Sequence, residues 1–124
     1  AARLTSAGRA IDDAAATTSA PTFGRLNWRF HCALYEAANR PRLVKTIRDL
    51  YIHASRWPDF AKHQRKSFAA ILAEHRAILR ACERRDVDGA LRVLERHVAA
   101  SERLLVTFVE ARPPRRGPSK ASKR

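Results

Sequence analysis

Three segments of this 124-residue chain carry apolar residues at the three- and four-residue spacing of a buried helical face, and each face has a histidine near its middle. A hydrophobic side chain is the default at such a position, because burying a polar group costs free energy unless it finds a partner. The three faces are Asn27, Phe30, His31, Leu34 and Ala38; Phe68, Ile71, Leu72, His75, Ile78, Leu79 and Cys82; and Leu91, Leu94, His97, Val98, Ser101, Leu105 and Phe108. They restrict the chain to folds in which helices share one interior.

The rest of the chain adds helices and no strands. No useful length shows the period-two alternation of a β-strand. Asn39 tolerates the left-handed backbone at a helix end, and Asp86 or Asp88 is a suitable N-cap for the last helix. Helical periodicity predicts segments over 3–16, 23–38, 41–57, 67–84 and from Asp86 or Asp88 to 111, with a polar linker over 62–66. We therefore predict an all-α fold, an antiparallel helical bundle with a central metal or effector cavity.

The spacing of the histidines predicts a metal site. His75 and His97 lie at equal sequence distances from Asp86, at the turn between the last two helices, so an antiparallel hairpin brings them to the same height. Asn27 and His31 are one helical turn apart and share a side of their helix. Three imidazoles and an amide oxygen are a ligand set for zinc, nickel or a similar divalent ion. We expect these four residues to hold one such ion; the alternative is a hydrogen-bonded core network without metal.

The segment 23–38 carries a second apolar row, formed by Trp28, Cys32 and Tyr35. It follows the same four- and three-residue spacing as the first row, so a second face of this helix is expected to be buried. We expect the row to face either the N-terminal helix or a dimer partner.

Composition narrows the class of protein. The longest apolar run, 68–73, is too short for a membrane span, and no stretch has the pattern of a signal peptide. Two cysteines in a chain with a full core predict reduced thiols and a cytoplasmic location. The net charge of +13 is concentrated in part in the basic, acid-free segment 112–124, which we expect to be a disordered tail rather than a sequence-specific DNA reader.

A set of short motifs resembles the FCD domain, the C-terminal effector-binding domain of FadR-type GntR transcriptional regulators. The resemblance spans residues 4–109, and we assign 1–111 to this domain. The motifs are Asn27-x-x-Phe30-His31, Asn39-x-x-x-Leu43 and Glu74-His75-Arg76-x-Ile78-Leu79-x-Ala81, followed by Asp86, Ala90 and His97.

The resemblance implies a helical bundle with a divalent metal at the floor of its cavity, held by Asn27, His31, His75 and His97. It also implies a small organic acid as effector, and homodimers that bind operator DNA through an N-terminal winged helix-turn-helix lying outside this sequence. Many members have Asp where this chain has Asn27, and a neutral amide leaves the site one charge more positive, which favours an anionic effector.

The resemblance further implies that polar or basic side chains above the metal select the acid. Candidates are Arg3, Arg9, Thr46, His53 and Ser101. The predicted function is thus a non-enzymatic, effector-sensing domain of a transcriptional regulator.

The alternative function is a small metal-dependent hydrolase, in which the metal activates water beside a general base. Glu74 precedes His75, but neighbouring helical residues point about 100° apart, so Glu74 is expected to face away from the metal. No other acid lies on the three histidine-bearing faces, which disfavours catalysis.

Overall fold

The computed structural model describes residues 2–55 and 58–111, and these residues contain helices and no strands. The all-α prediction is therefore confirmed, whereas the predicted tail over 112–124 lies outside the described residues. No described helix is long and apolar enough to cross a membrane. The elements are α1 (Ala2–Ala16), α2 (Ala20–Tyr35), the 3-10 turn η1 (Glu36–Ala38), α3 (Pro41–Ser55), α4 (Pro58–Gln64), the 3-10 turn η2 (Arg65–Ser67), α5 (Phe68–Glu83) and α6 (Val87–Glu110).

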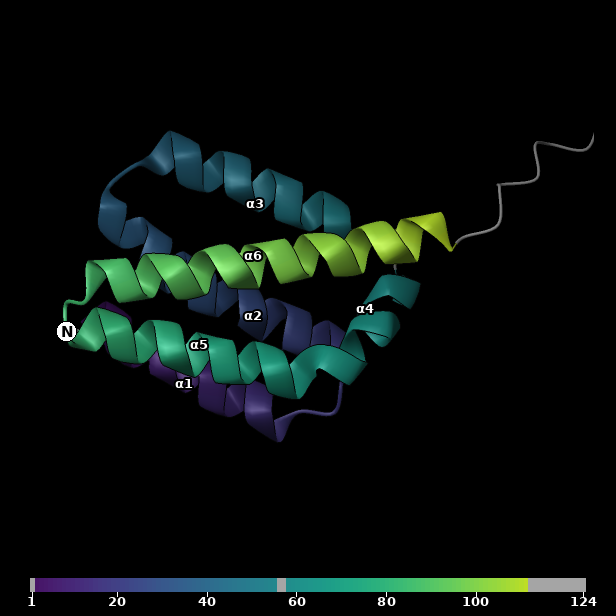
Figure 1. Ribbon diagram of the computed structural model, residues 1–124, viewed down its shortest axis with the longest axis horizontal. Coiled ribbons are helices and arrows are strands. Elements are labelled where there is room, and N and C mark those ends of the chain that lie inside the picture. Colours follow the sequence, from purple (N-terminus) through teal and green to yellow (C-terminus); the bar gives the residue numbers. More distant parts are fainter. Residues whose placement is uncertain (1, 56–57, 112–124) are drawn as a thin grey trace, which may run out of the picture.

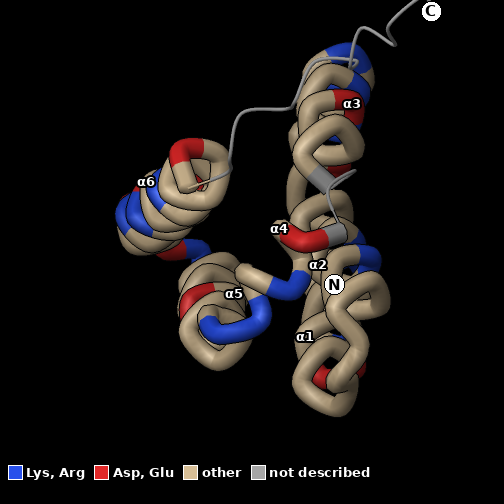
Figure 2. The backbone as a smooth tube through the Cα atoms, turned by 90° about the vertical axis from the view of Figure 1, so that its right-hand side faces the viewer, with Lys and Arg blue, Asp and Glu red and all other residues tan. Residues whose placement is uncertain are grey.

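The helices form two antiparallel pairs, α1 with α2 and α5 with α6 (Figure 1). Seen from the end, α1, α2 and α3 lie on one side of the molecule, and α5 and α6 lie on the other (Figure 2). α1 joins the two sides because it packs against both α2 and α5, while the short α4 contacts both α2 and α6. This arrangement confirms the predicted helical bundle.

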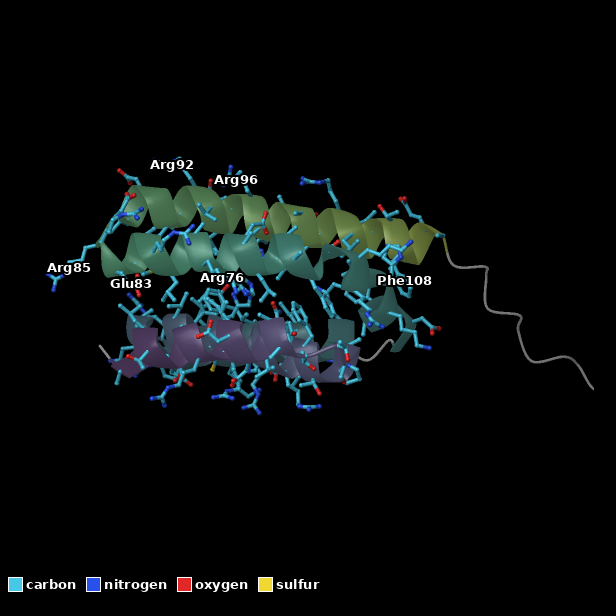
Figure 3. All side chains as sticks on the ribbon, turned by 90° about the horizontal axis from the view of Figure 1, so that it is seen from below. Arg76, Glu83, Arg85, Arg92, Arg96 and Phe108 are labelled. Atoms are coloured by element: carbon cyan, nitrogen blue, oxygen red, sulfur yellow. The ribbon has the colours of Figure 1, made fainter. Side chains whose placement is uncertain are left out.

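The core lies where α1 meets α2 and α5. α1 contributes mainly alanines, such as Ala7 and Ala10, whose small side chains let its neighbours approach closely. α2 contributes larger rings: Phe23 and Phe30 are almost fully buried, and Phe23 stacks on Phe68 with ring centroids 3.6 Å apart. Side chains fill the space between the α1–α2 layer and the α5–α6 layer, whereas Arg92 and Arg96 point outward from α6 (Figure 3).

The observed helix ends agree with the predicted ones at the positions where a capping residue was identified in the sequence. Asn39 adopts the left-handed conformation with φ 51°, and Asp86 caps α6 by accepting a hydrogen bond from the Gly89 amide at 2.8 Å. α2 begins earlier than the predicted residue 23, because Ser19 caps it and Pro21 fits its first turn, where no amide hydrogen is needed.

α4 was not predicted. The sequence suggested that Pro58 would end the preceding helix and that 62–66 would be a linker. Proline is instead well suited to a first helical turn, so Pro58 begins a new short helix that continues through Gln64. This helix caps the end of the bundle, where the rings of Phe60 and Phe108 lie 5.3 Å apart.

The apolar face predicted for α6 is only partly covered. His97 and Phe108 are buried, but Leu91 and Val98 are 50% and 53% exposed, because α6 packs on α5 along one side only. The second row of α2 is half-buried. Trp28 in this row packs against Tyr51 of α3, with ring centroids 5.2 Å apart, a contact that the sequence did not predict.

Candidate metal centre

Three histidines from three helices meet between the two layers. His31 on α2, His75 on α5 and His97 on α6 are all buried, and one ring nitrogen from each lies within 4.8 Å of the others. The Nε2 atoms of His75 and His97 are 3.3 Å apart. Two nitrogens bound at ~2.0–2.1 Å to one tetrahedral ion have about this separation. The predicted equal height of His75 and His97 is confirmed, and the three histidines are positioned to hold a metal ion.

Local structure holds these rings in place. The tight turn between α5 and α6, in which Arg85 takes a positive φ of 57° and Asp86 caps the next helix, sets the register of His75 against His97. Phe30 stacks on the His75 ring, with centroids 4.0 Å apart and planes 15° from parallel. An aromatic wall on one face of His75 limits the directions in which its nitrogens can point.

Burial keeps two of the histidines uncharged. Desolvation, with a smaller contribution from the neighbouring His97, lowers the pKa of His31 from 6.5 to about 3. Desolvation, with smaller contributions from His31 and His97, lowers the pKa of His75 from 6.5 to about 2. Metals bind the neutral form of imidazole, because only this form has a ring nitrogen with a free lone pair.

Glu74 supports His97 from the outer side. Its Oε2 lies 2.7 Å from His97 Nδ1, and the carboxylate is the acceptor of this hydrogen bond. A proton on Nδ1 leaves Nε2 unprotonated, and Nε2 is the atom that faces His75. Sequence reasoning placed Glu74 away from the metal and missed this contact. The sequence did contain the information for this contact. Glu74 is next to His75 on one helix of the hairpin, so it lies at about the same height as His97 on the other helix.

Asn27 lies one turn from His31 and has an unsatisfied oxygen. Asn27 Oδ1 and His31 Nδ1 are buried without any hydrogen-bond partner in the described structure. Buried polar atoms are seldom left unpaired, and a cation beside them would satisfy their lone pairs. The residues present therefore fit a divalent metal, and Asn27 remains the predicted fourth ligand.

The predicted effector-binding residues are more dispersed. Arg9 on α1 and both Thr46 and His53 on α3 are exposed, and Thr46 donates a hydrogen bond to a backbone carbonyl of its own helix. Ser101 on α6 is half-buried and lines, with Glu74, a groove of about 340 Å³ between α5 and α6. Their part in effector binding, like the central cavity, stays a prediction.

Comparison with known protein families gives one match, which agrees with the helical fold. Residues 1–100 match the model of the FCD domain family. No curated protein and no solved structure matches the chain. The family match covers most of the chain and includes all three histidines, so the chain belongs to the FCD domain family of GntR-type regulators.

Proposed function

We propose that this chain senses a small organic acid through a divalent metal, zinc or nickel, held by His31, His75, His97 and Asn27. FCD domains are the effector-sensing domains of GntR-type regulators. The main support for a metal is that three buried imidazoles converge and that Asn27 Oδ1, also buried, has no hydrogen-bond partner in the described structure. The regulator that contains this domain acts, in this proposal, as a cytoplasmic homodimer whose separate winged helix-turn-helix binds operator DNA.

The donor set favours an anionic effector. Three imidazole nitrogens and one amide oxygen include no anionic ligand, so a bound ion would keep a net positive charge and open coordination positions for a carboxylate. The surrounding apolar side chains, among them Phe30, lower the local dielectric constant and strengthen this attraction. A carboxylate with a small carbon skeleton has the matching chemistry.

The geometry disfavours the hydrolase alternative. A metal-dependent hydrolase needs a general base near the water on the metal. Glu74 is the acid in contact with the histidines, and its carboxylate accepts the Nδ1 proton of His97 on the side opposite Nε2. Glu74 thus orients a ligand rather than a water molecule.

A thermal-shift screen tests the proposal. Organic acids are added to the zinc- or nickel-loaded chain, to the chelated chain and to His75→Ala. An acid at a hundredfold excess over its dissociation constant is expected to stabilise the loaded native chain by about 2.7 kcal/mol. Equal stabilisation of the chelated chain and of His75→Ala would contradict a role for the metal in sensing. Hydrolysis of esters or amides by the metal-loaded chain would favour the alternative function, a metal-dependent hydrolase.

A further inference from the structure

Tyr51 of α3 connects the backbone of α2 to Asn27. Its Oη lies 2.6 Å from the Gly24 carbonyl oxygen and 3.2 Å from Asn27 Nδ2. Two oxygens at 2.6 Å need a proton between them, and a carbonyl has none to give, so the Tyr51 hydroxyl donates to Gly24. Since a hydroxyl carries one proton, Tyr51 can only accept a hydrogen bond from Asn27.

This arrangement sets the orientation of the Asn27 amide. Only the NH₂ end of an amide can donate to Tyr51, so Nδ2 points to α3 and Oδ1 is left as the buried atom without a partner. The Tyr51 ring is itself held by packing against Trp28, with centroids 5.2 Å apart. An unconstrained amide could rotate by half a turn and present its NH₂ group, which cannot bind a metal, in place of the oxygen.

We infer that Tyr51 is a positioning residue that directs Asn27 Oδ1 toward the metal site, and that it makes this site selective for Asn over Asp at position 27. The inference rests on the proposed metal site. An Asp carboxylate has no proton to offer, so it would face the lone pairs of Tyr51 Oη. It could instead capture the hydroxyl proton, leaving the Gly24 carbonyl without its partner. Asn27 and Tyr51 are therefore a matched pair.

The first test measures zinc affinity by chelator competition for the native chain, Tyr51→Phe and the matched control Tyr35→Phe. Tyr35 stacks on His31 with centroids 5.6 Å apart, and its hydroxyl has no hydrogen bond to a site residue within 2–55 and 58–111. Both substitutions keep the ring and remove one hydroxyl. We expect about a 10-fold loss of affinity for Tyr51→Phe, typical of a group that orients a metal ligand, and less than a twofold change for Tyr35→Phe. Equal effects of the two variants would overturn the inference.

The second test repeats Tyr51→Phe in an Asn27→Asp background. The carboxylate has two equivalent oxygens, so it needs no help in orientation, and removing the hydroxyl relieves its conflict with Oη. We therefore expect Tyr51→Phe to leave zinc affinity unchanged or raise it in this background, the reverse of its effect in the native chain. The visible absorption of cobalt-loaded protein should change with Tyr51→Phe only when Asn27 is present. The same loss of affinity in both backgrounds would mean that Tyr51 acts through general stability, and would overturn the inference.

A measurement on the native chain covers the case in which a variant fails to fold. Nuclear Overhauser effects between the Asn27 side-chain NH₂ and the Tyr51 ring are expected in the zinc-loaded protein, and their absence overturns the inference. If the native chain binds no zinc, the proposed function fails, and this inference with it. If the native chain binds zinc as tightly as Tyr51→Phe does, only the inference about Tyr51 fails.

Discussion

At the scale of single residues, burial determines the chemistry of the histidines. An exposed histidine titrates near neutral pH, but His31 and His75 are 8% and 1% exposed and their pKa values fall well below 6.5. Their neutral rings are the ones that meet His97 between the layers. The same burial that makes these rings costly to charge makes their lone pairs available to a cation.

This burial predicts a pH-dependent stability for the chelated chain. In the unfolded chain His31 and His75 take up protons as pH falls through 6.5, whereas in the folded chain they stay neutral until about pH 3 and about pH 2. The unfolded state therefore binds more protons below pH 6.5, so the stabilisation present above 6.5 is lost as pH falls. We expect the free energy of unfolding in urea to drop by roughly 3 kcal/mol between pH 7.5 and 5.5. A variant with leucine at both positions should lose most of this drop; an unchanged drop would contradict the assignment.

Glu74 is expected to affect metal affinity through His97. Glu74→Gln keeps the size of the side chain but removes the charge that holds the Nδ1 proton. We expect zinc binding to weaken about 10-fold, measured by chelator competition. Glu83→Gln, on the same helix at an exposed position, is the matched control and should bind zinc as the native chain does.

At the scale of elements, the α5–α6 hairpin positions two of the three histidines. Its turn places Arg85 in a left-handed conformation, and Asp86 then satisfies the Gly89 amide at the start of α6. Because α6 presents only Gly89, His97 and Phe108 as buried residues, its register depends strongly on this end of the hairpin.

Asp86→Ala is therefore expected to destabilise the fold by about 1 kcal/mol, the usual contribution of an N-cap. Thermal or urea unfolding of the chelated chain measures this loss. Asp88→Ala changes an exposed acid in the same first turn and should cost less, since it removes only a favourable interaction with the helix dipole. A greater loss from Asp88→Ala would show that the cap is not at Asp86.

At the scale of the whole molecule, the candidate metal site lies between the two layers. α1 packs on α2 and α5 through four buried residues, but α6 reaches the rest of the bundle mainly through α5 and α4. An ion bound to His31 and His97 would connect α2 directly to α6. Metal binding should therefore restrain α6 more than any other helix.

Hydrogen exchange followed by mass spectrometry tests this expectation. Chelation should increase amide exchange in Val87–Glu110 several-fold, with a smaller change in Ala2–Ala16, because local opening is easiest where few apolar residues are buried. His75→Ala should show the fast exchange of α6 with or without zinc. An equal increase along the whole chain would mean that the metal stabilises the bundle only as a unit.

The sequence alone determined the features that depend on local chemistry. Three- and four-residue periodicity predicted every described helix except α4. Asn39 marked one helix end, Asp86 or Asp88 marked another, and equal spacing from the turn brought His75 to His97. These features depend on residues close in the chain or on a single short hairpin.

The tertiary structure decided which element covers each face. Periodicity shows that a face is apolar, but it does not show what packs on it: Leu91 and Val98 are exposed, and Trp28 is covered by α3. Contacts between helices distant in sequence, such as that of Tyr51 with Asn27, depend on how far apart the backbones lie and how far a side chain reaches. Those distances follow from the packing of all the helices together, so no single segment of sequence contains them.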